Sequence, residues 1–178
     1  MKRANNSFTL AKLLLTVLFA TCAVLAPVLL KKLPDSGSSL LLSQLPILLC
    51  GFICGGPLGL IAGIITPFLR LALFQAPALI PDAVAMALEL GAYGLFCGLL
   101  FKKFGSAAYG AYPATLLAML LGRAVWGGAM FVTLKISGGD FGFATFANGI
   151  FNGEMPGIII QIVLIPPFIT FLRRVKVI

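Results

Sequence analysis

The chain has 178 residues, of which 60% are hydrophobic and only 10% are charged, and its mean hydropathy is +1.09. Soluble domains carry about 25% charged residues, so this composition excludes an ordinary soluble domain and predicts one integral membrane domain over residues 1–178. The absence of His excludes His-based acid–base catalysis and most zinc sites. The net charge of +8 is spread over loops and helix ends, a distribution that indicates membrane topology rather than nucleic-acid binding.

The first apolar segment, residues 8–30, is longer than the hydrophobic region of a usual signal peptide, so we expect it to be retained as a helix. A polar loop is predicted over residues 31–39. Thr16, Ala20 and Ala23 form a patch of small residues on the first helix. Small residues permit close approach of helices in a membrane, which makes this patch a candidate interface with a partner subunit. Contact within the monomer explains the pattern equally well.

Residues 40–74 form a long apolar stretch in which Arg70 is the only charge. As an unbroken helix it would be ~50 Å long, whereas the hydrocarbon core of a bilayer is ~30 Å thick. The chain must therefore reverse. Gly55-Gly56-Pro57 provides the break, because glycine permits positive φ and proline suits the first turn of a helix. The pattern predicts two membrane helices over residues 41–54 and 57–73.

Three further apolar segments follow this hairpin, separated by short basic, proline-containing or glycine-rich loops. Asp82 falls in the expected first turn of the first of them. We predict helices over residues 81–101, 108–135 and 143–172, the last of them bent by prolines. The predicted fold class is therefore an all-α membrane protein, in which six transmembrane helices form a compact bundle.

The basic residues predict an orientation, because cytoplasmic loops are enriched in Lys and Arg. With both termini in the cytoplasm, the cytoplasmic segments carry more of these residues than the external ones and no acidic residue. The cytoplasmic set is Lys2, Arg3, Lys12, Lys102, Lys103, Arg173, Arg174 and Lys176, and the external set is Lys31, Lys32, Arg70 and Lys135. The predicted orientation is N-in, C-in.

Charged residues within membrane helices are costly and usually functional, which directs attention to Glu89 and Arg123. Tyr93 lies one helical turn from Glu89, and Trp126 lies close to one turn from Arg123. A cavity with aromatic walls and a few polar groups is typical of a small-ligand site, so all four residues are predicted to contact a ligand. A structural ion pair between Glu89 and Arg123 is an equally good interpretation, and one pair can serve both purposes.

Polar residues of two other segments complete the predicted ligand site. Asn148 and Asn152 lie on one face of the last helix, where hydrogen bonding between helices is the alternative role. Glu154 precedes Pro156 and is expected to satisfy backbone groups that the proline frees. Gln44, at the start of the hairpin, is the remaining candidate.

Four stretches of the sequence resemble the membrane-embedded substrate-binding subunits (S-components) of energy-coupling factor transporters. They are LPILLCG (45–51), GGPLGLIAGIITPFLR (55–70), AMALELGAYGLFCGLLFKK (85–103) and LLGRAVWGG (120–128). The resemblance runs from about residue 8 to the end of the chain. Many members of that family carry a His just before the first proline of this region, where this chain has Gln44 and Leu45.

The resemblance implies a function in a bacterial or archaeal cell membrane. The chain would capture a vitamin or a vitamin precursor from outside, with riboflavin, pantothenate, a pyridoxine-like compound and a thiamine precursor among the candidates. A transmembrane coupling subunit and two ATPase subunits would complete the transporter, since this sequence contains no P-loop. In the family, an alanine-spaced face of the first helix contacts the coupling subunit.

A stand-alone small transporter or channel and an intramembrane enzyme are the alternative functions. The enzyme has less support, because no paired Asp, Ser–Lys or metal-ligand motif is present. The four Cys all lie in apolar segments and are expected to be buried thiols rather than ligands of a metal. No cofactor is predicted.

Overall fold

The computed structural model describes residues 2–29, 36–75, 78–104, 110–136, 142 and 155–174. Over these ranges the chain forms helices and no strand, which confirms the all-α prediction for this part of the protein. The helices are α1 (Lys2–Leu29), α2 (Ser36–Cys54), α3 (Gly56–Phe74), the short segment η1 (Leu79–Ala83), α4 (Val84–Phe104), α5 (Ala111–Ile136) and α7 (Met155–Arg174).

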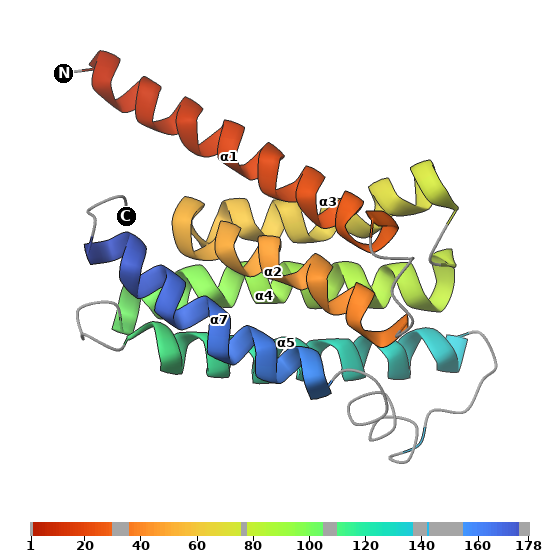
Figure 1. The fold of residues 1–178 in the computed structure, drawn as a ribbon. Coiled ribbons are helices and arrows are strands. Elements are labelled where there is room, and N and C mark those ends of the chain that lie inside the picture. Colours follow the sequence, from red (N-terminus) through yellow and green to blue (C-terminus); the bar gives the residue numbers. More distant parts are fainter. Residues whose placement is uncertain are drawn as a thin grey trace.

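The long helices form one bundle, in which each helix runs in the direction opposite to the one before it in the sequence (Figure 1). The start of α1, the turn between α2 and α3, the end of α4 and the end of α7 all lie at one end, on the left of the figure. We call this the basic end. The last turns of α4 and α7 carry Lys102, Lys103, Arg173 and Arg174 there, and Lys12 of α1 lies near the turn between α2 and α3. The opposite end holds η1, the start of α2 and the end of α5.

The reversal between α2 and α3 lies where the sequence predicted it. Gly55 has a φ of 102°, a backbone conformation that side chains disfavour, and Pro57 stands in the first turn of α3. The observed α3 extends the predicted range 57–73 by one residue at each end. The break thus converts one overlong apolar stretch into two antiparallel helices.

Other boundaries differ from the prediction. The first helix begins at Lys2 rather than at residue 8, and α2 begins at Ser36, inside the expected loop 31–39. Hydropathy reports the part of a helix that fits the hydrocarbon, whereas backbone hydrogen bonds continue the helix into polar sequence. The last helix is described only from Met155, so the expected helical residues 143–154 lie outside the described part of the chain.

Glycines allow α2, α3 and α4 to pack almost backbone to backbone. A Cβ atom on Gly94 of α4 would overlap the backbone of Gly59 in α3, and one on Gly63 would overlap the backbone of Leu90. Between α2 and α4, a Cβ on Gly51 would overlap the carbonyl oxygen of Gly94. Such close approach increases van der Waals contact, which is one of the forces that associate helices in a membrane, where the hydrophobic effect between helices is absent.

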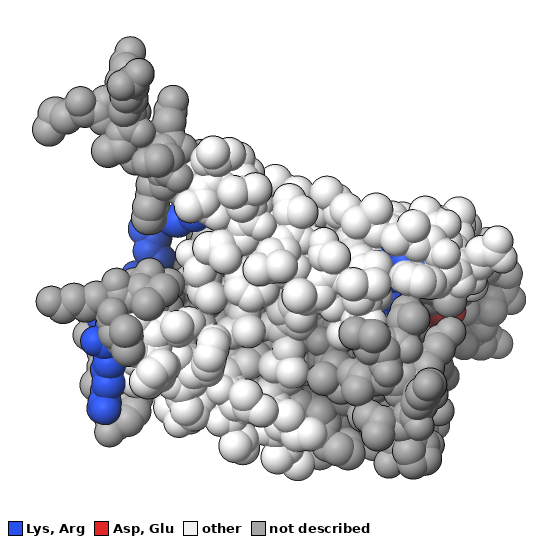
Figure 2. All heavy atoms as spheres, turned by 45° about the horizontal axis from the view of Figure 1, so that its top comes forward, with Lys and Arg blue, Asp and Glu red and all other residues white. Residues whose placement is uncertain are grey.

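Within the described residues, four helices are long and apolar enough to cross a membrane, by length and composition: 10–27 within α1, then α3, α4 and α5. Residues 44–54 of α2 form a shorter apolar segment. Figure 2 shows a broad middle surface without charged side chains, with Lys and Arg side chains at the basic end and a smaller group of basic and acidic atoms toward the opposite end. The chain therefore has the character of a membrane protein, as its composition predicted.

Candidate functional site

An ion pair joins α4 to α5 in the interior of the bundle. Arg123 Nη1 lies 3.1 Å from Glu89 Oε1, and the two residues are only 8% and 4% exposed. Each charge would be costly among apolar helices, and the pairing offsets part of that cost. The ion pair that the sequence offered as one interpretation of these residues is therefore present. Whether the pair also contacts a ligand stays a prediction.

Tyr93 completes the environment of the carboxylate. Its phenolic hydroxyl donates a hydrogen bond of 2.7 Å to the same Oε1 of Glu89, one helical turn away on α4. The Tyr93 ring lies against Gly122 of α5, where a side chain would overlap it, and this close contact holds the ring at the junction of α4 and α5. One carboxylate oxygen thus forms the ion pair with the guanidinium of α5 and accepts the hydrogen bond of the phenol.

Trp126 also lies close to the guanidinium. Arg123 Cζ lies 5.6 Å from the centre of the Trp126 ring, within the range of a cation–π interaction. Both residues lie on α5, three positions apart, so the helix itself sets this contact. Because the protein contains one Trp, the fluorescence of Trp126 reports directly on the surroundings of Arg123.

A second polar contact links α2 to α7. The Gln161 side-chain amide donates a hydrogen bond of 2.9 Å to Gln44 Oε1, and the two residues are 1% and 5% exposed. Gln161 was not predicted as a site residue. Its signal in the sequence was its place as the only amide in an otherwise apolar helix.

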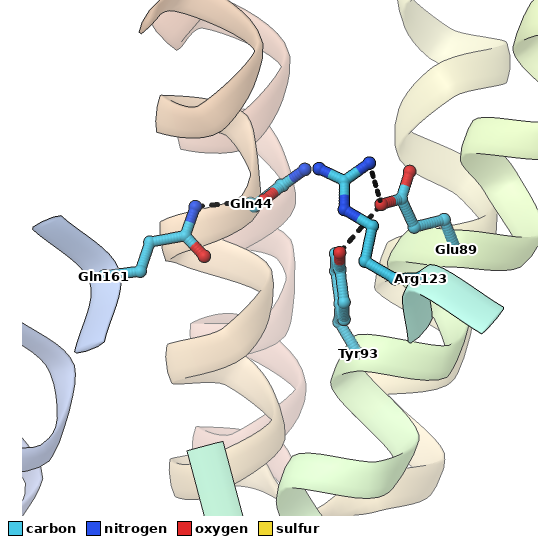
Figure 3. Close-up of polar contacts among 5 residues, drawn as sticks. All are labelled: Gln44, Glu89, Tyr93, Arg123 and Gln161. Atoms are coloured by element: carbon cyan, nitrogen blue, oxygen red, sulfur yellow. Dashed lines mark hydrogen bonds and ion pairs between the residues drawn. The ribbon is translucent and has the colours of Figure 1, made fainter. Parts of the chain in front are cut away.

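The two contacts converge in the middle of the bundle (Figure 3). Gln44 stands between them, with its side chain directed toward the guanidinium of Arg123 and its oxygen bonded to Gln161. We call these five residues from four helices, Gln44, Glu89, Tyr93, Arg123 and Gln161, the polar cluster. Together they present a cation, an anion, a phenol and two amides, groups that bind a small polar molecule by hydrogen bonds and charge.

The remaining predicted site residues have different outcomes. Asn148, Asn152 and Glu154 lie outside the described residues, so their roles stay predictions. Thr16 and Ala23 on α1 are buried inside the bundle, and the Cys50 thiol of α2 donates a hydrogen bond of 3.8 Å to Thr16 Oγ1. Thr16 and Ala23 therefore pack within the monomer, which was one of the two interpretations of the small-residue patch.

Ala20 is half-buried and packs against the core. The face that α1 leaves uncovered in the monomer is apolar and includes Leu14, Val17 and Leu18, which are 64%, 64% and 56% exposed. A partner that docks on α1 without rearranging the bundle would contact these residues instead of Thr16 and Ala23.

The predicted topology placed Arg70 on the outer side, and the structure adds that it is buried on α3. Its Nη1 atom has no hydrogen-bond partner among the described residues.

Among the described residues, no group of three or more His, Cys, Asp or Glu side chains could hold a metal ion.

In comparisons with known proteins, no protein-family model, no curated protein and no solved structure matches the chain.

Proposed function

We propose that the chain is a membrane-embedded substrate-binding subunit of an energy-coupling factor transporter, which captures a vitamin-like molecule for import. The polar cluster is the observation that carries this proposal. Five buried polar side chains from four helices meet inside an apolar bundle, where apolar residues of similar size would pack at lower cost. The sequence resemblance to the S-components supports the more specific assignment.

The ligand is proposed to bind among the side chains of the polar cluster. Its polar groups would replace the hydrogen bond between Gln44 and Gln161 and contact the Arg123 guanidinium beside them. The Trp126 ring offers an aromatic surface next to this position. A ring compound with hydrogen-bonding substituents, as the vitamins of this class are, fits these groups in chemistry.

The energy for import is proposed to come from partner subunits, because the sequence has no nucleotide-binding motif. The coupling subunit would dock on the exposed apolar face of α1. Replacement of Val17 by Glu is expected to abolish assembly with a coupling subunit in pull-downs from membranes and to leave ligand binding unchanged. The matched change Leu120→Glu, on the exposed face of α5, should leave assembly intact. Equal loss in both variants would contradict this docking face.

The proposed membrane arrangement has six spans and both termini in the cytoplasm, with the basic end facing inward. Support comes from the Lys and Arg side chains at that end (Figure 2). In a Cys-free background, a Cys at position 75 should react with a membrane-impermeant reagent in intact cells. A Cys at position 103 should react only after permeabilisation. The reverse pattern would contradict the orientation.

Transport by the purified chain tests the proposed function. A small molecule extracted from the purified protein and labelled isotopically is the probe. Proteoliposomes that contain the chain alone should bind this compound without accumulating it and should hydrolyse no ATP. Accumulation should appear only when a coupling subunit and ATPases are added. Accumulation by the chain alone would instead identify a stand-alone transporter, and chemical conversion of the compound would identify an enzyme.

A further inference from the structure

A groove opens at the basic end, away from the polar cluster. Its floor is the turn between α2 and α3, and its walls come from α1 and α4. The volume of about 410 Å³ falls in the range of small-molecule sites, roughly 300–1,000 Å³. Gly55 lies on the floor, and a Cβ atom there would meet no other atom within 4 Å, so the absence of a side chain contributes to the hollow.

Two lysines from different helices line this groove. Lys12 belongs to α1 and Lys102 to the last turn of α4. None of the residues that line the groove is acidic. Of the acidic residues whose side chains are described, Glu89 is paired with Arg123 and Asp82 lies in η1 at the opposite end of the bundle. The groove is therefore a place of positive potential, to which the N-terminus of α3 adds.

The rest of the lining is apolar. Ile53 and Leu99 contribute aliphatic surface, and Phe52 and Phe101 meet edge to face with ring centres 5.2 Å apart. Leu99 is 49% exposed, so this apolar wall opens toward the outside of the bundle. A soluble anion would leave such a wall in contact with water, whereas a molecule with hydrocarbon chains would cover it.

The groove also lies at the depth where lipid headgroups are found. Lys12 stands two residues into the apolar span 10–27 of α1, and Lys102 stands two residues before the end of α4. Both ammonium groups are thus at the boundary between hydrocarbon and headgroups if these helices cross the bilayer.

We propose that this groove binds one anionic phospholipid of the phosphatidylglycerol type. The phosphate contacts Lys12 and Lys102, and the first methylenes of an acyl chain lie along Leu99 and Ile53. Basic pockets between helices are the usual sites for anionic headgroups on the cytoplasmic side of membrane proteins. This assignment does not depend on the identity of the transported ligand, which would bind at the polar cluster instead.

Native mass spectrometry of the delipidated protein tests the proposal with two lipids of the same acyl chains, dioleoylphosphatidylglycerol and dioleoylphosphatidylcholine. The wild type should bind the anionic lipid at least tenfold more tightly. Each removed charge should weaken binding about fivefold, so the double variant Lys12→Gln/Lys102→Gln should lose the preference. The charge-retaining variant Lys12→Arg/Lys102→Arg should keep it, which separates loss of charge from loss of fold.

Lys103 provides the matched control. It is the next residue on α4, carries the same charge and does not line the groove; its ammonium lies 5.9 Å from the Phe104 ring. Lys103→Gln should change the affinity for the anionic lipid less than twofold. An equal loss in Lys103→Gln would mean diffuse surface attraction and would overturn the proposal. Equal affinity of the wild type for glycerol 1-phosphate would also overturn it, because the site would then belong to a soluble phosphate compound.

Discussion

Glu89→Gln and Arg123→Met are each expected to lower the stability of the folded protein by about 3–5 kcal/mol, the usual cost of breaking a buried ion pair on one side. The two residues are almost fully buried and 3.1 Å apart, so either change leaves the opposite charge without its partner inside the bundle. The midpoint of thermal unfolding in detergent measures the effect. The double variant should recover a large part of the loss, because it leaves no unpaired charge.

Tyr93→Phe is the control for this cycle. It removes one hydrogen bond to Glu89 and keeps the ring against Gly122, so a loss of only about 1 kcal/mol is expected. If the losses of the two charge variants simply add in the double variant, the ion pair does not contribute to the stability of the bundle.

Gly94→Val is expected to destabilise the protein by more than 1 kcal/mol and to prevent normal packing of α3 against α4. A side chain at Gly94 would overlap the backbone of Gly59, and neither helix backbone can yield without moving the whole helix. Gly128→Ala, on an exposed face of α5, is the matched control, because a Cβ there meets no atom within 4 Å. The midpoint temperature of thermal unfolding of this control should be unchanged or slightly higher, because Ala has a higher helix propensity than Gly. Equal tolerance at both positions would contradict the close packing.

Much of the fold was predictable from the sequence because membrane helices obey strong local constraints. The length of the apolar stretch required a reversal, and Gly55 and Pro57 marked its place. The ion pair between Glu89 and Arg123, which the structure contains, was one of two equally good interpretations, because isolated charges are costly inside a membrane. Gly and Pro at a reversal, and charged residues within apolar helices, each have few structural roles that are physically acceptable.

The rest depended on contacts between distant parts of the chain. Gln161 and Gln44 are 117 positions apart, and nothing local distinguishes a glutamine that bonds across the bundle from one that does not. The small residues of α1 predicted close packing correctly, but the pattern could not say whether α2 or another protein supplies the opposite face. The burial of Arg70 likewise depends on the helices that surround α3.

The most direct test of the central claim is native mass spectrometry of the wild type and the Glu89→Gln/Arg123→Met double variant, purified side by side in a mild detergent. If the polar cluster holds the ligand, the wild type carries one small molecule per chain, and the folded double variant carries none. The same bound mass in both proteins would contradict the claim and would leave the Glu89–Arg123 pair with a structural role alone.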